Sequence, residues 1–278
     1  MWCKQCQFET NEKICPVCKS ATVEDTPTEI YWCAQCLTPV IHIAAAKDKG
    51  ICPICGGSTK YLAADLRPVF PEEKILLAQI LQEPPQKFLN CSVWAEANRY
   101  YIDGKARAIP AKTFTETNAA KIAAQIKNFS DKINYDAFNE MTAKFVQANE
   151  TRLFFLKEEA VNFVQSAAQK FPEENIVISF SGGKDSTVTA DIVTKALSNS
   201  SLVHIFGDTT LEFPATLDYA ERYRAARPLA IFQVAHNDEQ NFFKVCEDIG
   251  PPARMMRWCC SMFKTGSITR VINSFYCS

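Results

Sequence analysis

The sequence predicts a mixed α/β protein: an open, mostly parallel sheet with flanking helices, preceded by two small cysteine-rich modules and a small β-containing module. Two observations carry this prediction. Eight cysteines form four C-x-x-C pairs near the N-terminus, and beyond Pro172 short apolar segments alternate with helical ones. Such alternation is typical of a parallel sheet covered on both faces, with ligands bound at the carboxyl ends of the strands.

The composition indicates a globular chain without a global electrostatic signal. Of 278 residues, 47% are hydrophobic, and 30 basic residues balance 31 acidic ones. Anion binding therefore requires a local patch. The N-terminus has no signal-peptide pattern, and no apolar run is long enough to cross a bilayer. We expect no membrane partner, and a reducing, cytoplasmic location.

The cysteine-rich region contains one unit twice. WCKQC and ICPVC form the first unit, and WCAQC and ICPIC form the second. Two such knuckles supply four thiolates, which bind Zn²⁺ tetrahedrally, so each unit is expected to be a zinc ribbon. The expected ligands are Cys3, Cys6, Cys15 and Cys18 for one ion, and Cys33, Cys36, Cys52 and Cys55 for the other.

Two alternatives concern these metal sites. Pairing the middle two knuckles with each other would break the repeat, and iron in a rubredoxin-like site would use the same ligands as zinc. Closed Cys₄ sites are normally structural. The ribbons are therefore expected to stabilise the chain and to dock a partner, a nucleic acid or the rest of the chain.

The middle of the chain predicts a small module followed by helices. Pro71 begins a helix that extends to about Leu81, and the stretch from Phe88 to Pro110 is predicted as strands, with Asp103-Gly104 as a hairpin turn. Residues 117–170 are predicted to form two or three helices. The aromatic residues at helical spacing in this region are expected in the core: Phe154, Phe155 and Phe163.

From Asn175 the predicted elements alternate between strand and helix. The predicted strands are residues 175–180, 202–206 and 229–235, and the predicted helices are residues 182–197 and 213–226. His204 lies within a strand and is expected in the core. His236 follows a strand end, where loops carry function more often than strand interiors do.

The stretch SFSGGKDS, which follows the first of these strands and begins a helix, is suited to binding phosphate. Gly182 and Gly183 let the backbone approach an anion closely, Ser181 and Ser186 add hydroxyl groups, and Lys184 adds positive charge. The helix N-terminus contributes free N–H groups and a favourable dipole. The stretch matches neither the Walker A pattern nor G-x-G-x-x-G.

Three motifs together resemble one family. SFSGGKDS resembles the PP-loop of the adenine nucleotide α-hydrolase superfamily, which includes the N-type ATP pyrophosphatases and the phosphoadenosine phosphosulfate (PAPS) reductases. FGDTTLEFPAT resembles the second loop of the PAPS reductase family, and RWCCSMFKTG resembles the Cys-Cys and basic segment of sulfonucleotide reductases. The resemblance extends from Asn149 to Ile272.

The resemblance implies an adenine nucleotide over the sheet, with its phosphates or sulfate on the PP-loop and the Asp208 loop near the base and ribose. The nucleotide-binding residues that it implies are Ser179, Ser181, Gly182, Gly183, Lys184, Asp185, Ser186, Asp208, Thr209, Phe213, Arg257 and Lys264. Cys259 and Cys260 are the candidate catalytic residues, because cationic neighbours favour the thiolate.

The chain also departs from the family pattern. Iron–sulfur members pair their Cys-Cys with a later C-x-x-C, which is not present here. Four domains are expected along the chain. Residues 1–60 form two tandem zinc ribbons, residues 61–115 a small α+β module, and residues 116–148 a helical linker. Residues 149–278 form a PAPS reductase-like domain that is expected to be incomplete at its C-terminus. A [4Fe–4S] cluster on Cys259 and Cys260 is implied if the chain continues.

Three functions follow as hypotheses. The first is thiol-dependent reduction of adenosine phosphosulfate (APS) or PAPS to sulfite, with a thiol or ferredoxin as reductant. The second is an ATP pyrophosphatase that adenylates a nucleic-acid or small substrate for sulfur transfer, with the ribbons binding nucleic acid. The third is a nucleotide-binding scaffold without catalysis.

Overall fold

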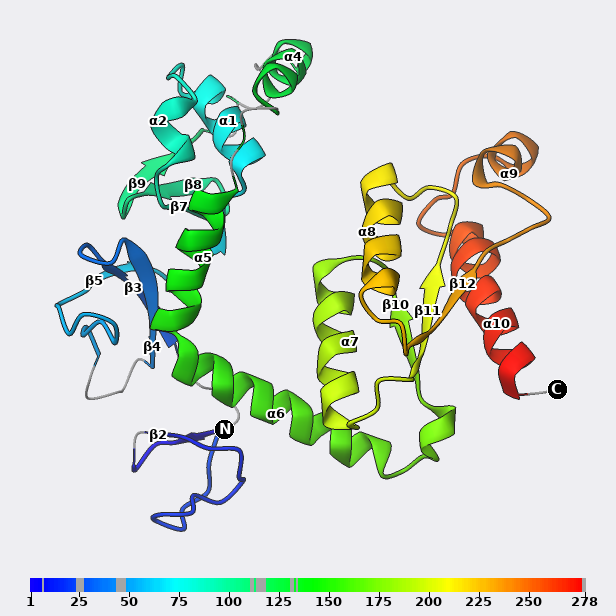
Figure 1. Cartoon of the computed structure of the whole chain (residues 1–278), viewed down its shortest axis with the longest axis horizontal. Helices are drawn as coiled ribbons and strands as arrows, with labels where there is room; N and C mark the ends of the chain where they lie inside the picture. The colour runs from blue at the N-terminus through cyan, green and yellow to red at the C-terminus, as the bar shows by residue number, and fades with distance from the viewer. Residues whose placement is uncertain are drawn as a thin grey trace. The chain divides into compact units, whose positions relative to one another are not determined.

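The computed structural model describes residues 1–6, 8–23, 28–43, 49–110, 113, 119–130, 133 and 135–276. It divides into two compact units, Met1–Leu156 and Lys157–Ser278 (Figure 1). Helices flank a parallel sheet in the second unit, and the first unit begins with the cysteine clusters, so the predicted fold class is confirmed. No described helix combines the length and the apolar character that crossing a bilayer requires.

Both cysteine repeats fold into small antiparallel β-structures. The strands are β1 (Trp2–Cys3) and β2 (Phe8–Glu9) in the first, and β3 (Thr28–Cys33), β4 (Thr38–Ile43) and β5 (Lys60–Ala63), in the order β4-β3-β5, in the second. Cysteines occupy much of their small interiors, because Cys3, Cys15, Cys33 and Cys52 are almost fully buried. The interiors are therefore too small to be stable through apolar burial alone.

The module that follows combines two helices with a four-stranded antiparallel sheet. Its elements are β6 (Arg67–Pro68), α1 (Pro71–Ile80), α2 (Gln86–Leu89), β7 (Val93–Glu96), β8 (Arg99–Ile102) and β9 (Lys105–Ala108). The predicted helix and hairpin are confirmed. Asp103 and Gly104, with φ of 46° and 77°, form the tight turn between β8 and β9.

The prediction that strands begin at Phe88 is wrong, because Phe88 lies in α2. Pro85, at the N-cap of α2, has a φ of −55°, which suits a helical turn. The fully buried Lys74 donates from Nζ to the carbonyl oxygens of Leu89 (3.3 Å) and Cys91 (2.7 Å). This buried ammonium satisfies carbonyl groups after the turn, a long-range contact that local sequence patterns do not reveal.

Helices α4 (Ala119–Ser130), α5 (Asp136–Ala148) and α6 (Glu150–Ala168) follow, as predicted. Phe138 and Met141 of α5 pack against Trp94 and Tyr101 of the module and Trp32 of the second ribbon. The α5 helix therefore shares a core with both neighbours in its unit.

Asn149, between α5 and α6, is buried and bonds directly to strand β4. Its Oδ1 accepts from the Ile41 N–H at 2.6 Å, and its Nδ2 donates to the Pro39 carbonyl at 3.1 Å and to the Phe145 carbonyl at 2.7 Å. The side-chain amide thus pairs with the β4 backbone as a neighbouring strand would.

The prediction that the α6 aromatics form core is wrong. Phe154 and Phe163 are 56% and 73% exposed, and no residue of α6 is buried. Apolar residues at helical spacing define a face, but a face becomes core only where another element packs on it.

The second unit contains the predicted alternation of strands and helices. Its elements are a 3₁₀ turn (Glu173–Asn175), β10 (Val177–Phe180), α7 (Lys184–Ala196), β11 (Val203–Gly207), α8 (Pro214–Ala225), β12 (Ile231–Ala235), α9 (Phe242–Ile249), a π-helix (Cys260–Thr265) and α10 (Gly266–Tyr276). The strands pair in parallel in the order β10-β11-β12. Their carboxyl ends therefore meet at one edge, hereafter the carboxyl edge of the sheet.

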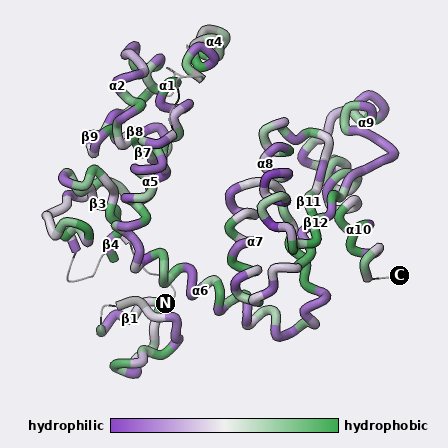
Figure 2. Tube along the Cα trace, viewed as in Figure 1, coloured by the Kyte–Doolittle hydropathy of each residue, from purple (hydrophilic) through white to green (hydrophobic). Residues whose placement is uncertain are grey.

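Helices cover both faces of this sheet (Figure 1). Ile178, Phe180 and Phe206 pack on one face against Ala190 of α7 and Tyr223 of α8. On the other face α10 contacts β11 and β12. Figure 2 shows the hydrophobic residues gathered on β11 and β12.

His204, in β11, is held in the core as a neutral ring. Its Nδ1 donates to the Leu202 carbonyl at 2.9 Å, and its Nε2 accepts from the Tyr223 hydroxyl at 3.3 Å. Burial lowers the pKa of His204 because a charged ring in the core would lose its hydration.

This burial predicts a loss of stability in mild acid. A His whose folded-state pKa is lowered contributes stability that is complete above its ordinary pKa of about 6.5 and declines as the pH falls below it. Urea midpoints measured from pH 7.5 to 5.5 are expected to fall more steeply for the wild type than for His204→Asn. Equal slopes would contradict the prediction.

Candidate functional site

Each Cys₄ cluster has the dimensions of a tetrahedral thiolate site. The four ligand atoms of each lie within 4.8 Å of one another. Short Sγ–Sγ distances are 3.5 Å for Cys3–Cys18, 3.8 Å for Cys6–Cys15, 3.6 Å for Cys33–Cys55 and 3.8 Å for Cys36–Cys52. Metal–sulfur bonds of about 2.3 Å would separate tetrahedral sulfurs by about 3.8 Å. The clusters fit zinc, and the predicted pairing within each repeat is confirmed.

The surroundings of the sulfurs also suit a bound cation. Backbone N–H groups of Cys6, Cys36 and Gly57 donate to cysteine sulfurs at 3.3 to 3.4 Å, which spreads thiolate charge into the backbone. Without a cation, burial and the neighbouring thiols raise the pKa of Cys36 well above its usual range. Metal binding must therefore displace protons, so affinity falls as the pH falls.

The loop after β10 leaves the N-terminus of α7 open. Gly183 is the N-cap, and no side chain caps the first turn. Hydrogen bonds within the loop hold its conformation. Ser186 Oγ donates to the Gly183 carbonyl at 2.9 Å and accepts from the Ser181 N–H at 3.2 Å. The free N–H groups of this turn are available to an anion.

Gly182 brings the first two motifs into contact. Its φ is 72°, and a Cβ at this position would lie 3.0 Å from Cγ2 of Thr216, in the first turn of α8. A larger residue would push the loop away from α8. The motif threonine therefore has a packing role that sequence reasoning did not assign.

Three predicted loop residues differ in their placement. Lys184 and Asp185 form an ion pair, and both side chains are almost fully exposed. Ser179 lies within β10 and is exposed between the buried Ile178 and Phe180. Its side chain therefore lies on the sheet face opposite α7, at the next-to-last residue of β10.

The loop after β11 is ordered around Asp208. The Asp208 N–H donates to the Ala235 carbonyl at 2.9 Å, and Asp208 Oδ1 accepts from the Thr210 N–H at 2.8 Å. Thr209 donates from its backbone N–H and its hydroxyl to Glu212, at 2.9 and 2.8 Å. Phe213 precedes α8 and is 78% exposed.

Asp208 also contacts a residue that the predicted site does not include. Its Oδ2 lies 3.1 Å from Nδ1 of His236, which directly follows β12. The position of His236 at a strand end was the only available signal, because its partner lies 28 residues away in the sequence.

The Cys-Cys segment is tied to the same edge of the sheet. Asn237, buried after β12, donates from Nδ2 to the Met262 carbonyl at 3.3 Å. Cys259 and Cys260 are half-buried at the start of the π-helix, and Arg257 Nη2 lies 3.5 Å from Cys260 Sγ. Lys264 is exposed. The segment thus carries thiols and cations beside the strand ends.

These three segments correspond to a known domain family. Residues 175–276 match the family model described as Phosphoadenosine phosphosulfate reductase domain, and the match contains all three motifs. The chain contains a PAPS reductase domain. The family implies adenine-nucleotide binding by the PP-loop that the domain carries.

Two curated relatives from Methanocaldococcus jannaschii resemble the chain. Uncharacterized protein MJ0066 is 32% identical over 142 residues, which are 51% of this chain and 28% of the relative. Uncharacterized protein MJ0973 is 25% identical over 138 residues, 49% of this chain and 32% of the relative. The chain thus spans less than a third of the length of these relatives.

The described part of the PAPS reductase domain does not supply the ligands of an iron–sulfur cluster. A [4Fe–4S] cluster needs four ligands, usually thiolates. Among the described residues, Cys259 and Cys260 form no group with a third His, Cys, Asp or Glu ligand.

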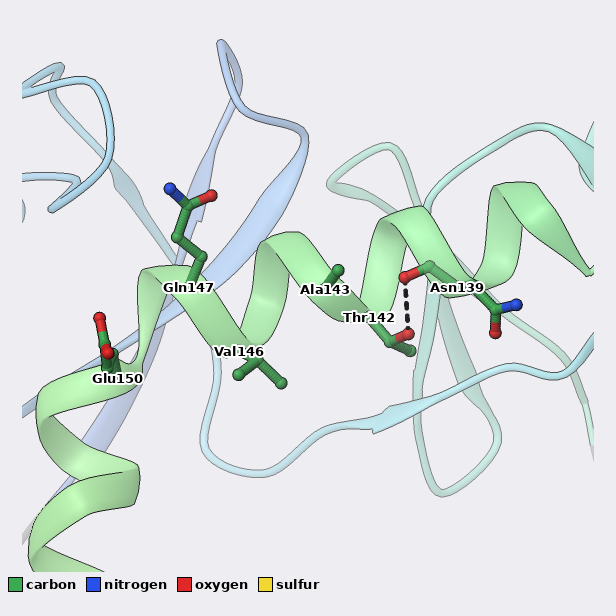
Figure 3. A pocket seen from close by; sticks show the side chains of 6 residues that line it. All are labelled: Asn139, Thr142, Ala143, Val146, Gln147 and Glu150. Carbon is green, nitrogen blue, oxygen red and sulfur yellow. Dashed lines mark hydrogen bonds between the residues drawn. The ribbon is translucent and has the colours of Figure 1, made fainter.

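The hollow shown in Figure 3 lies outside the PAPS reductase domain. It is open, measures about 600 Å³ and is lined by one face of α5 and the start of α6. Glu150 is its only titratable residue. None of its lining residues belongs to the three motifs.

Proposed function

We propose that the chain reduces a sulfonucleotide, APS or PAPS, to sulfite at the carboxyl edge of its PAPS reductase domain. A thiol sulfur would attack the sulfate sulfur, the adenine nucleotide would leave, and a second thiol would form a disulfide and release sulfite. The two thiols thus supply the two electrons. Cys259 and Cys260 are the proposed catalytic residues.

The observation that carries this proposal is the meeting of three segments at one edge. The PP-loop follows β10, the Asp208 loop follows β11, and Asn237, after β12, bonds the Cys-Cys segment. Ligands of such sheets bind at this edge. Further proposed nucleotide contacts are Ser179, Ser181, Gly182, Gly183, Lys184, Asp185, Ser186, Thr209, Phe213, Arg257 and Lys264.

A second candidate function is ATP pyrophosphatase chemistry, in which the α-phosphate is transferred to a substrate that then receives sulfur. The two Cys₄ ribbons favour it, because such modules can dock nucleic acid.

Product analysis separates the candidates. The purified chain is incubated with APS, PAPS or ATP, with dithiothreitol as the thiol. Sulfite release from APS or PAPS supports the reductase, and pyrophosphate release from ATP supports the alternative. Nucleotide binding without either product would support a non-catalytic scaffold.

Gly183→Ala is expected to weaken nucleotide binding at least about tenfold without unfolding the domain. A Cβ here would lie 3.6 Å from Ser181 Oγ, an ordinary contact, so the loop can keep its conformation. The added methyl group would stand at the N-terminus of α7, where the anion has to approach the backbone. Calorimetry with APS and ATP measures the affinity, and thermal unfolding checks the fold. Unchanged affinity would argue against this loop as the binding site.

A further inference from the structure

A carboxylate–imidazole pair, Asp208 and His236, lies at the carboxyl edge of the sheet. Asp208 belongs to the second motif, and His236 lies outside all three motifs. Asp208 Oδ2 lies 3.1 Å from His236 Nδ1, while Asp208 Oδ1 accepts from the Thr210 N–H at 2.8 Å. Protein groups thus hold both carboxylate oxygens. The backbone bond from Asp208 to Ala235 ties the two strand ends together, which fixes the pair in place.

The pair leaves one nitrogen of the imidazole for another partner. Because the carboxylate faces Nδ1, that nitrogen carries a proton, and Nε2 becomes the second polar atom of the ring. In the part of the chain that the structure describes, no protein group bonds Nε2. The His236 side chain is 38% exposed, against 25% for Asp208, so the ring is the more open member of the pair.

The other histidine of this sheet shows the contrast. His204 uses both ring nitrogens within the core, on Leu202 and Tyr223. Its role is accounted for by packing. His236 instead has an oriented ring with one nitrogen available, which is the arrangement that carboxylates give to functional histidines.

The pair also lies between two segments of the proposed site. Asp208 belongs to the second motif, and Asn237, directly after His236, donates to the Met262 carbonyl of the π-helix. A ligand that spans the strand ends between the PP-loop and the Cys-Cys segment would pass this ring.

We infer that His236 contacts the phosphate or sulfate of the bound nucleotide through Nε2, and that Asp208 is its positioning residue. In its protonated form, the ring donates Nδ1–H to Asp208 and Nε2–H to the anion. The inference rests on the proposed function, because it takes the adenine nucleotide from it.

Proton NMR of the full chain tests this inference, since the sequence contains only three histidines. AMP and APS are titrated separately, and calorimetry gives each Kd. The Cε1 proton signal of His236, assigned by its loss in His236→Gln, is expected to shift with the same Kd, whereas the His204 signal stays in place. His236→Gln is expected to weaken binding about tenfold, as for one lost charge-assisted bond. Asp208→Asn should reduce the nucleotide-induced shift of His236 at an unchanged thermal midpoint.

Asp238→Asn serves as the matched control, because Asp238 is an exposed carboxylate two residues further along the chain. It should leave both the shift and the affinity as in the wild type. A shift with AMP identifies the phosphate as the contact, and a shift with APS alone identifies the sulfate. If nucleotide binds while the His236 signal stays fixed, the inference fails and the proposed function stands. If AMP, APS and PAPS, titrated in the same way, all fail to bind, both the inference and the proposed function fail.

Discussion

Chelation is expected to unfold both ribbons and to release about two metal ions per chain, one for each Cys₄ cluster. Structural zinc supplies on the order of 10 kcal/mol of folding free energy in small domains. Inside the clusters little can replace it, because buried cysteines occupy the metal-facing interiors, although Trp32 of the second ribbon also packs against the module and α5. Plasma mass spectrometry measures the metal, and the dispersion of the Trp2 and Trp32 indole signals in NMR spectra reports the ribbon fold.

Single substitutions make this test selective. Cys36→Ser should lower the metal content from about two ions to about one, since it removes a ligand of the second cluster only. Cys91→Ser should leave the content unchanged, because Cys91 lies outside both clusters and its thiol bonds the Lys87 carbonyl. Native indole dispersion in the metal-free chain would show that apolar packing suffices.

Gly104→Ala is expected to destabilise the first unit by more than about 3 kcal/mol. A Cβ at Gly104 would lie 2.4 Å from Cδ1 and Nε1 of Trp32, and the φ of 77° is itself unfavourable for alanine. Trp32 is buried in the core shared by the second ribbon, the module and α5, so it has little room to move. Urea unfolding monitored by tryptophan fluorescence measures the loss.

Gly50→Ala separates the clash from the backbone term. Gly50 has a φ of 89°, but a Cβ there would meet nothing within 4 Å. Its cost should therefore be about 1 to 2 kcal/mol, the penalty for left-handed backbone alone. Equal losses for the two variants would refute a specific contact between the turn and Trp32.

The sequence allowed much of the fold to be predicted where local chemistry decides the structure. The doubled C-x-x-C spacing predicted which cysteines would cluster. The Asp103-Gly104 turn predicted the hairpin, because both residues tolerate positive φ. The alternation after Pro172 predicted the strands and helices whose order places the PP-loop at a strand end.

Features that depend on distant partners could not be predicted. The contact between Asp208 and His236 follows from the parallel pairing of Gly207 with Ala235, which neither local segment encodes. Ser179 is exposed because side chains alternate between the two faces of β10. The resemblance to a family motif assigned Ser179 to the loop without taking this alternation into account. The spacing of apolar residues also did not predict the π-helix that follows Cys259.

The side chain of Asn149 has a consequence for cooperativity. It pairs with the backbone of β4 at Pro39 and Ile41, while its own carbonyl accepts the N–H of Leu153 in the first turn of α6. The strand and the helix therefore share one residue as a common hydrogen-bonding element. Opening of the second ribbon should deprotect the Leu153 amide at the same time, so hydrogen exchange at the start of α6 becomes a remote reporter of metal occupancy.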